Sequence, residues 1–113
     1  MKADLREKVL ERCQGLCEKC GRSLPESWAL HHRKLRSQGG KDAVENFVAL
    51  HHACHNMGTD AVHMNPASAI KNGHIVPSWG NPDTTSVTLA DGSSVILTKE
   101  GTYQYLERGE NGW

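Results

Sequence analysis

Two short stretches of sequence decide the fold: residues 17–21 read Cys-Glu-Lys-Cys-Gly, and residues 51–55 read His-His-Ala-Cys-His. In each stretch, two side chains that can bind a metal are separated by two residues. This spacing lets one tight turn present two ligands to a tetrahedral ion, and a structural zinc site needs two such pairs. A shared ion would also stabilise a segment too short to bury a large core. The pattern predicts a structural Zn²⁺ site with four ligands: Cys17, Cys20, His51 and Cys54.

Two alternatives remain open for this site. Cys17 and Cys20 could form a redox pair, but such a pair is expected between a strand and a helix. Here the preceding segment, residues 3–14, has the pattern of a helix, so zinc is the favoured interpretation. His52 could replace His51 as the fourth ligand, and only the two-residue spacing to Cys54 favours His51.

Length and composition limit the classes of protein to which this chain can belong. The chain has 113 residues and a mass of 12.5 kDa, the size of one domain. Hydrophobic residues make up 37%, and the 11 glycines bring the apolar share into the range of about 45–50% that is typical of globular proteins. No run approaches the roughly 18 apolar residues of a spanning helix, and the N-terminus lacks the apolar core of a signal peptide. We expect a soluble, cytoplasmic protein with reduced cysteines and no membrane partner.

Charge is balanced overall but not locally. The 13 basic and 13 acidic side chains cancel, which argues against binding to nucleic acid through bulk charge. The segment 31–41 differs because it holds four basic side chains and no acidic one. Such a run is often only a solvated loop, but beside a histidine pair it could neutralise DNA phosphates and give salt-dependent affinity. The predicted phosphate contacts are Arg33, Lys34, Arg36 and Lys41.

The N-terminal segment has the pattern of an amphipathic helix. Leu5, Val9 and Cys13 recur on one face over residues 3–14, and Gly15 is placed to end the helix. A free cysteine on such a face is more often a small buried residue than a ligand. We therefore predict that Cys13 lies in the core and outside the metal site.

The remaining elements are short. Apolar runs over residues 28–35 and 46–50 predict two strands. A helix is expected to begin at residue 54 or 55 and to run toward His63, and Asn65-Pro66 is typical of the start of a further short helix that ends at Gly73. Three strands joined by turns, one of them Asp91-Gly92, are predicted over residues 86–90, 94–98 and 102–106.

The pair His31-His32 lies in the first predicted strand. Neighbouring residues of a strand point to opposite sides, so one imidazole could hold an ion while the other acts on a substrate. An imidazole with an ordinary pKa of about 6.5 can accept a proton from water at pH 7. Paired histidines are also common as surface or packing residues, and the pair alone does not decide between these roles.

Taken together, the two metal-binding stretches, the histidine pair and a spaced asparagine resemble the HNH endonuclease family. The resemblance covers roughly residues 5–66, and residues 62–83 more loosely resemble HNH proteins of bacteriophages that infect actinobacteria. The matching elements are Cys17-x2-Cys20-Gly21, His31-His32-Arg33, Gly39-Gly40-x-Asp42, Asn46 and Leu50-His51-x2-Cys54-His55.

The resemblance implies a role for each matching residue. His32 corresponds to the general base that activates water for attack on a DNA phosphate, and Asn46 to the asparagine that orders the loop and orients the base. His31 and His55 correspond to ligands of one catalytic divalent ion. Histidine ligands admit Mn²⁺, Ni²⁺, Co²⁺ or Zn²⁺ as readily as Mg²⁺. We therefore expect an ion softer than Mg²⁺ to be effective.

The sequence departs from the family pattern at two positions. Many members have a cysteine where this chain has His51, and imidazole is an acceptable substitute as a zinc ligand. Relatives often have a further histidine four residues after His55, where this chain has Thr59. His63 could supply that ligand if the intervening segment contains a short insertion, or it could only cap a helix.

These observations predict an α+β fold: a small zinc-stapled ββα-metal core of the His-Me finger type, with an N-terminal helix and a C-terminal β meander. Residues 1–66 would form the nuclease core, and 67–113 an accessory region packed on it. The predicted function is metal-dependent cleavage of DNA, by nicking or double-strand cutting, with a phage terminase as the partner that the resemblance implies. The alternatives are a non-catalytic zinc-stapled module that binds DNA or protein, and a structural accessory of a packaging motor.

The tryptophans are assigned separately. Trp28 and Trp79 are predicted to pack in the core rather than to stack on bases. Trp113, the last residue, supports no functional assignment.

Overall fold

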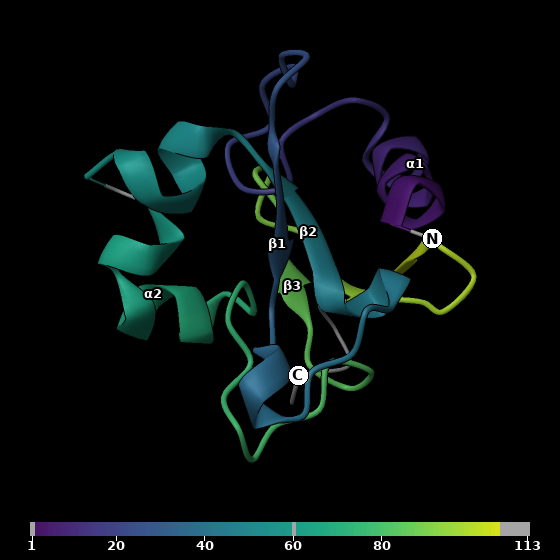
Figure 1. Ribbon diagram of the computed structural model, residues 1–113, viewed down its shortest axis with the longest axis vertical. Helices are drawn as coiled ribbons and strands as arrows, with labels where there is room; N and C mark the ends of the chain where they lie inside the picture. Colours follow the sequence, from purple (N-terminus) through teal and green to yellow (C-terminus); the bar gives the residue numbers. More distant parts are fainter. Residues whose placement is uncertain (1, 60, 107–113) are drawn as a thin grey trace.

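The computed structural model describes residues 2–59 and 61–106, and it places helices on both sides of a two-stranded sheet with a three-stranded sheet beyond it (Figure 1). This is the small mixed helix-and-sheet fold that the sequence predicts. No described helix has the length and apolar character needed to cross a bilayer. The elements in chain order, with η for short 3-10 or π helices, are α1 (Lys2–Cys13), β1 (Ala29–His32), η1 (Arg36–Gln38), η2 (Val44–Asn46), β2 (Phe47–Leu50), η3 (Ala53–Met57), η4 (Val62–Met64), α2 (Pro66–Lys71), β3 (Val87–Thr88), β4 (Ser94–Leu97) and β5 (Tyr103–Tyr105).

The first sheet is the antiparallel pair β1–β2, in which Ala29 lies opposite Leu50 and His32 opposite Phe47. All four residues of β2 are buried, because α1 packs on one face of the strand and side chains from α2, β3 and β4 pack on the other. Burial alternates along β1, where His31 is buried and His32 is only half-buried. The two histidines therefore leave the strand on opposite sides, as the alternation of a strand requires.

The alternation of β2 divides the buried side chains into two groups. Phe47 and Ala49 face α1 and pack with Val9, Cys13 and Trp28, so the predicted core positions of Cys13 and Trp28 are confirmed. Val48 and Leu50 belong to the other group, which joins side chains from α2, β3 and β4. This group spans the chain from Cys17 to Leu97, so residues on both sides of position 66 share one core.

The helix predicted from residue 54 or 55 to His63 is not a single element. The π-helix η3 ends at Gly58, whose backbone is extended (φ −101°, ψ 164°) and whose N–H donates to the Ala53 carbonyl at 2.9 Å. A side chain at position 58 would not fit, because its Cβ would lie 2.6 Å from the Ala53 carbonyl oxygen. The chain then turns and forms η4. This break brings His63 back toward His55.

The short helix α2 begins after Asn65 with Pro66 at its first turn, as predicted. The Asn65 side chain does not cap the helix; its Nδ2 donates to the carbonyls of Thr59 and Ala61 at 2.7 and 3.0 Å and fastens the preceding loop. After α2, Gly73 adopts φ +77°, and a Cβ there would lie 1.9 Å from the Ser86 carbonyl oxygen. Glycine therefore lets the chain turn sharply against the start of the meander.

The C-terminal strands form the predicted antiparallel meander in the order β3-β4-β5. Val87 lies opposite Val95, and Leu97 opposite Tyr103. The Asp91-Gly92 turn also forms: Gly92 has φ +88°, and the Asp91 carboxylate accepts the Ser93 N–H at 2.9 Å. The meander covers the face of the core that β1–β2 and α2 leave open.

Candidate active site and metal centre

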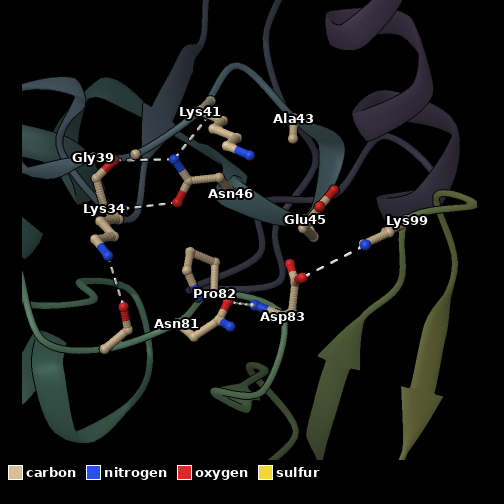
Figure 2. Close-up of a pocket in the computed structure, with 12 residues that line it drawn as sticks. Lys34, Gly39, Lys41, Ala43, Glu45, Asn46, Asn81, Pro82, Asp83 and Lys99 are labelled. Atoms are coloured by element: carbon tan, nitrogen blue, oxygen red, sulfur yellow. Dashed lines mark hydrogen bonds and ion pairs between the residues drawn. The ribbon is translucent and has the colours of Figure 1, made fainter.

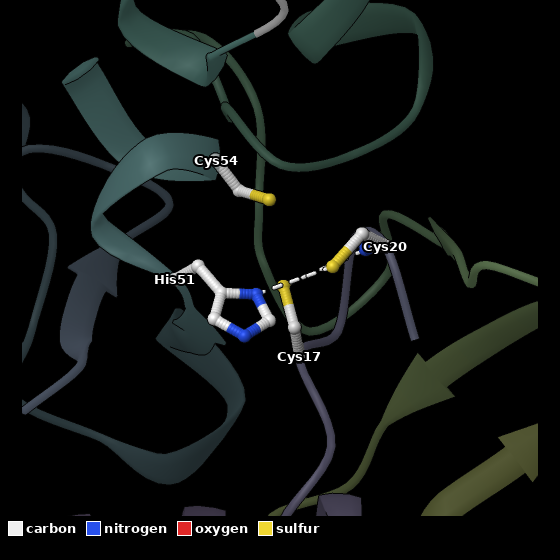
Figure 3. A group of neighbouring side chains, drawn as sticks. All are labelled: Cys17, Cys20, His51 and Cys54. Atoms are coloured by element: carbon white, nitrogen blue, oxygen red, sulfur yellow. Dashed lines mark hydrogen bonds between the residues drawn. The ribbon is translucent and has the colours of Figure 1, made fainter. Parts of the chain in front are cut away.

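The four predicted zinc ligands meet in the structure, with their side chains directed toward one centre (Figure 3). The ligand atoms of Cys17, Cys20, His51 and Cys54 all lie within 4.8 Å of one another. The Cys20 Sγ and His51 Nδ1 are 3.2 Å apart. Sulfur and nitrogen ligands of a tetrahedral zinc lie roughly 3.6 Å apart, given bond lengths of about 2.3 and 2.05 Å. The cluster can therefore hold a structural zinc ion after only a small adjustment.

The geometry selects His51 rather than His52. The His51 Nε2 donates to the Ser23 carbonyl at 2.7 Å, so this nitrogen carries the proton and Nδ1 keeps the lone pair that faces the thiols. A hydrogen bond of this kind orients many metal-binding histidines. His52 is exposed, and its Nε2 lies 3.0 Å from the Ser27 hydroxyl, outside the cluster.

The thiols of the cluster differ in acidity. Burial opposes ionisation of Cys20, but hydrogen bonds from the Arg22 backbone and side chain and from the neighbouring thiols outweigh it and lower the Cys20 pKa to about 6. Burial, together with the charge and hydrogen bonding of Cys17 and Cys20, raises the Cys54 pKa to about 12. Because zinc binds thiolates, the ion must displace the proton of Cys54, and its affinity should fall as the pH falls.

Glu18, between the two cysteines of the first turn, fastens this turn to the sheet. Its backbone N–H donates to the Ala49 carbonyl, and its carboxylate accepts the Ala49 N–H, each at 2.8 Å. The carboxylate also forms a buried ion pair with Arg12 at 2.7 Å and accepts a hydrogen bond from the Tyr103 hydroxyl. Burial and the Glu18 charge raise the Tyr103 pKa. Such a buried charge is tolerated because it is fully paired.

A second cluster joins three histidines from three elements: His31 of β1, His55 of η3 and His63 of η4. The Nε2 atoms of His55 and His63 are 3.0 Å apart, close to the roughly 3.3 Å that separates two nitrogens on one tetrahedral ion. The His31 ring centroid lies 5.0 and 5.1 Å from the other two. Thr59 is not among the ligands that the described residues bring together here. The cluster can therefore hold a divalent ion through three imidazoles.

Burial favours the neutral form of two histidines of this cluster, His31 and His55. Burial, reinforced by His55 and His63, lowers the His31 pKa to about 3. Burial and the neighbouring His63 also lower the His55 pKa. The His31 Nε2 donates to the His74 carbonyl at 2.8 Å, so its Nδ1 keeps the lone pair. A neutral imidazole with a free lone pair is the form that binds a metal.

His32 lies on the other side of β1. Its ring packs on Phe47, with centroids 4.5 Å apart, and its Nε2 lies 2.8 Å from the Asp42 carboxylate. A carboxylate accepts the hydrogen bond, so Nε2 carries a proton, and in the neutral imidazole Nδ1 has the lone pair. One cleft of about 260 Å³ is bordered by His32 and also by His31 and His63 of the cluster. Sequence reasoning gave Asp42 no role, because a spacing of ten residues across a loop does not reveal the contact.

Asn46 holds the loop between these histidines and β2 (Figure 2). The side chain is buried, its Oδ1 accepts the Lys34 N–H at 2.8 Å, and its Nδ2 donates to the carbonyls of Lys34 and Lys41 at 3.0 Å each. The Asn46 carbonyl also accepts the Arg33 N–H at 2.7 Å. These bonds fix both ends of the loop that carries Asp42.

Both metal-binding turns, the histidine pair, Asn46 and His55 lie in one continuous segment of the chain. Residues 17–61 match the HNH endonuclease family. The match agrees with the resemblance predicted from the sequence, and it relates this segment to a family of endonucleases. The mixed helix-and-sheet fold with its Cys/His cluster is compatible with a zinc-stapled HNH core. No curated protein and no solved structure matches the chain.

The four basic side chains that follow His31 and His32 in the sequence differ in their exposure to solvent. Arg36 and Lys41 are exposed, whereas the Lys34 Nζ donates to the Gly80 carbonyl at 2.8 Å. Arg33 is 1% exposed and donates to four carbonyls, those of Gly73, Glu45, Pro82 and Thr85. Burial lowers its pKa to about 10, so it is still charged at pH 7. The predicted phosphate contact by Arg33 is therefore corrected: this side chain fastens β1 to the later loops.

The prediction for Trp79 is also wrong. Its side chain is 85% exposed and lines the cleft beside His31 and His63 instead of packing in the core. Trp28 is buried, and the Arg6 guanidinium lies 3.8 Å above its ring. Trp113 lies outside the described residues.

Proposed function

We propose that this chain is a metal-dependent HNH endonuclease that hydrolyses phosphodiester bonds of DNA. One observation carries the proposal: the cleft bordered by His31 and His63 of the histidine cluster is also bordered by His32, whose tautomer is set by a carboxylate. A module that only binds DNA has no need for a metal-binding cluster and an oriented base in one cleft.

The three histidines would hold the catalytic ion, and His32 would act as the general base. A divalent ion at His31, His55 and His63 would stabilise the negative charge that develops on the phosphate and on the leaving oxygen. The His32 Nδ1 accepts the proton of the attacking water while the water oxygen bonds to phosphorus and the bond to the leaving sugar oxygen breaks. The resemblance to the family implies products with 5′-phosphate and 3′-hydroxyl ends.

Two residues would position the base. Asp42 accepts the His32 Nε2–H, so in the neutral imidazole the lone pair lies on Nδ1. Asn46 holds the loop on which Asp42 lies through three side-chain hydrogen bonds. Both contacts are made by the protein's own groups, and together they would orient the base.

The two clusters would differ in the ions they hold. Three thiols and one imidazole suit a closed, structural Zn²⁺ site. Three imidazoles leave positions open for water or phosphate, and they favour Mn²⁺, Ni²⁺ or Zn²⁺ over Mg²⁺, which prefers oxygen ligands.

DNA would be held mainly through its phosphates. Arg36 and Lys41 are exposed on the loop beside His32, and Lys34 and Lys41 line a polar cavity of about 400 Å³ next to Asn46. Contacts of this kind give affinity without sequence recognition and weaken with salt.

The proposed origin of the chain and its proposed domain organisation rest on the sequence resemblance. The likeness of residues 62–83 to phage HNH proteins supports a phage origin and a terminase as partner in DNA packaging. Residues 1–66 would then supply the chemistry, and the described residues of the region 67–113 would complete the shared core and one wall of the cleft.

Cleavage of a supercoiled plasmid tests this function. Wild type should nick or linearise the plasmid with Mn²⁺ or Ni²⁺, and His32→Ala should lose this activity while retaining one zinc per chain. His52→Ala, at an exposed histidine outside both clusters, is the matched control and should cut like wild type. If wild type binds DNA but cuts with no ion, the chain is the non-catalytic zinc-stapled module instead.

A further inference from the structure

Trp79 lies in a turn whose backbone is anchored to the rest of the protein. The Gly80 N–H donates to the Pro77 carbonyl at 2.9 Å, and the Gly80 carbonyl accepts the Lys34 Nζ at 2.8 Å. At the start of this segment, the Val76 N–H donates to the Arg33 carbonyl at 2.8 Å. The backbone on both sides of Trp79 is therefore fastened to the two residues that follow β1, while the indole itself is 85% exposed.

The indole forms one wall of the cleft that leads to the histidine cluster. Five further apolar residues line the cleft, and two of them, Leu35 and Ile70, are themselves 48% and 42% exposed. Half of the polar residues that line the cleft are histidines: His31, His32 and His63. The cleft thus joins an apolar, partly aromatic wall to a site that suits a phosphate group and a cation.

We propose that Trp79 stacks on an unpaired base of the DNA substrate, at a nucleotide adjoining the bond that is cut. This inference rests on the proposed nuclease function. A nucleotide combines the two chemistries of the cleft, because it has a flat apolar base one sugar away from its phosphate. The volume of about 260 Å³ lies near the lower limit of about 300–1,000 Å³ for small-ligand pockets, which suits a single base.

The stacking partner must be unpaired. In a duplex, both faces of each base are already covered by neighbouring bases, so an indole can reach one only if it is extruded or single-stranded. The preferred substrate is then DNA with unpaired nucleotides next to the cut, such as a single strand or a bulged duplex, rather than a perfect duplex.

Binding experiments with the uncleaving His32→Ala protein test this inference. The probes are a labelled single-stranded oligonucleotide, its perfect duplex, and the same duplex with a bulge. A further Trp79→Ala change should weaken binding of the single strand and the bulged duplex by roughly 5- to 150-fold, the range for loss of one stacked base. Binding of the perfect duplex should change less than twofold.

Two variants control for the loss of a large apolar side chain. Trp79→Phe keeps an aromatic face and should restore most of the affinity. Met57→Ala removes another exposed apolar side chain, 77% exposed and outside the cleft, and should change nothing. Single-stranded DNA should also quench indole fluorescence in the Trp79 protein and not in Trp79→Phe.

The outcomes separate the two proposals. If plasmid is cut and DNA is bound, but Trp79→Ala weakens all three probes equally or not at all, the stacking inference is wrong and the nuclease function stands. If plasmid is not cut by wild type and none of the probes binds, the proposed function and the inference fall together.

Discussion

Replacing His74 with leucine should remove part of the sensitivity of the folded protein to acid. The His74 side chain is 3% exposed, and within the described residues neither ring nitrogen has a hydrogen-bond partner. Burial, reinforced by the positive charges of Lys19 and Arg33, lowers its pKa from an ordinary value of 6.5 to about 4. The folded protein therefore keeps His74 neutral at a pH where the unfolded chain protonates it.

The size of the effect follows from the two pKa values. Between pH 6.5 and 4 the unfolded chain binds a proton that the folded protein does not, so the free energy of unfolding falls as the pH falls. The full slope for one group is about 1.4 kcal/mol per pH unit. When the pH falls from about 7.5 to 5, the free energy of unfolding of the wild type should therefore decrease by about 2 kcal/mol more than that of His74→Leu.

Urea unfolding of both proteins at about pH 7.5 and pH 5 measures this difference. Both retain the Cys/His cluster, so acid release of zinc affects them alike, and metal analysis at each pH confirms it. His52→Leu, at an exposed histidine, is the control and should follow the wild type. If wild type and His74→Leu lose the same stability on acidification, His74 is not a buried neutral histidine and the reasoning is refuted.

Further predictions concern the loop, the zinc cluster and the basic side chains. Asn46→Asp should destabilise the fold by about 2–5 kcal/mol in urea unfolding, because a carboxylate replaces a donor between two carbonyls; a loss below about 1 kcal/mol would contradict the assigned bonds. Cys54→Ser should lower the zinc content measured by metal analysis, whereas His51→Cys should retain one zinc per chain, and an equal loss in both would argue against the cluster. Arg33→Lys should destabilise the fold by about 2–4 kcal/mol, since one ammonium cannot serve four carbonyls. Arg36→Ala should leave the stability unchanged, weaken DNA binding and reduce the slope of log affinity against log salt by about 1. If Arg33→Lys instead weakened DNA binding without loss of stability, and Arg36→Ala destabilised the fold, Arg33 would be the residue that contacts DNA.

Features that depend on neighbouring residues were predictable from the sequence. Two cysteines or a histidine and a cysteine separated by two residues face the same way in one turn, so the cluster at Cys17 and His51 could be predicted in detail. The alternation of β1 placed His31 and His32 on opposite sides for the same local reason. The Asp91-Gly92 turn and the core face of α1 are equally local.

The candidate catalytic cluster was predictable only in part. His63 lies near His55 because the helix breaks at Gly58, and the steric reason for that break is a contact with Ala53 that a helical pattern does not show. Asp42 reaches His32 because Asn46 folds the loop between them. Both contacts arise from loop conformation, for which one sequence carries little signal.

Sequence by itself determined which chemical groups this protein brings to its sites and, through their spacing, that two turns can share one zinc ion. Tertiary structure alone decided which of the remaining side chains face water. Arg33 is buried and Trp79 is exposed, the reverse of what a basic residue and a tryptophan usually do. Burial depends on what packs over a side chain, and here the carbonyls that surround Arg33 come from residues 12 to 52 positions further along the chain.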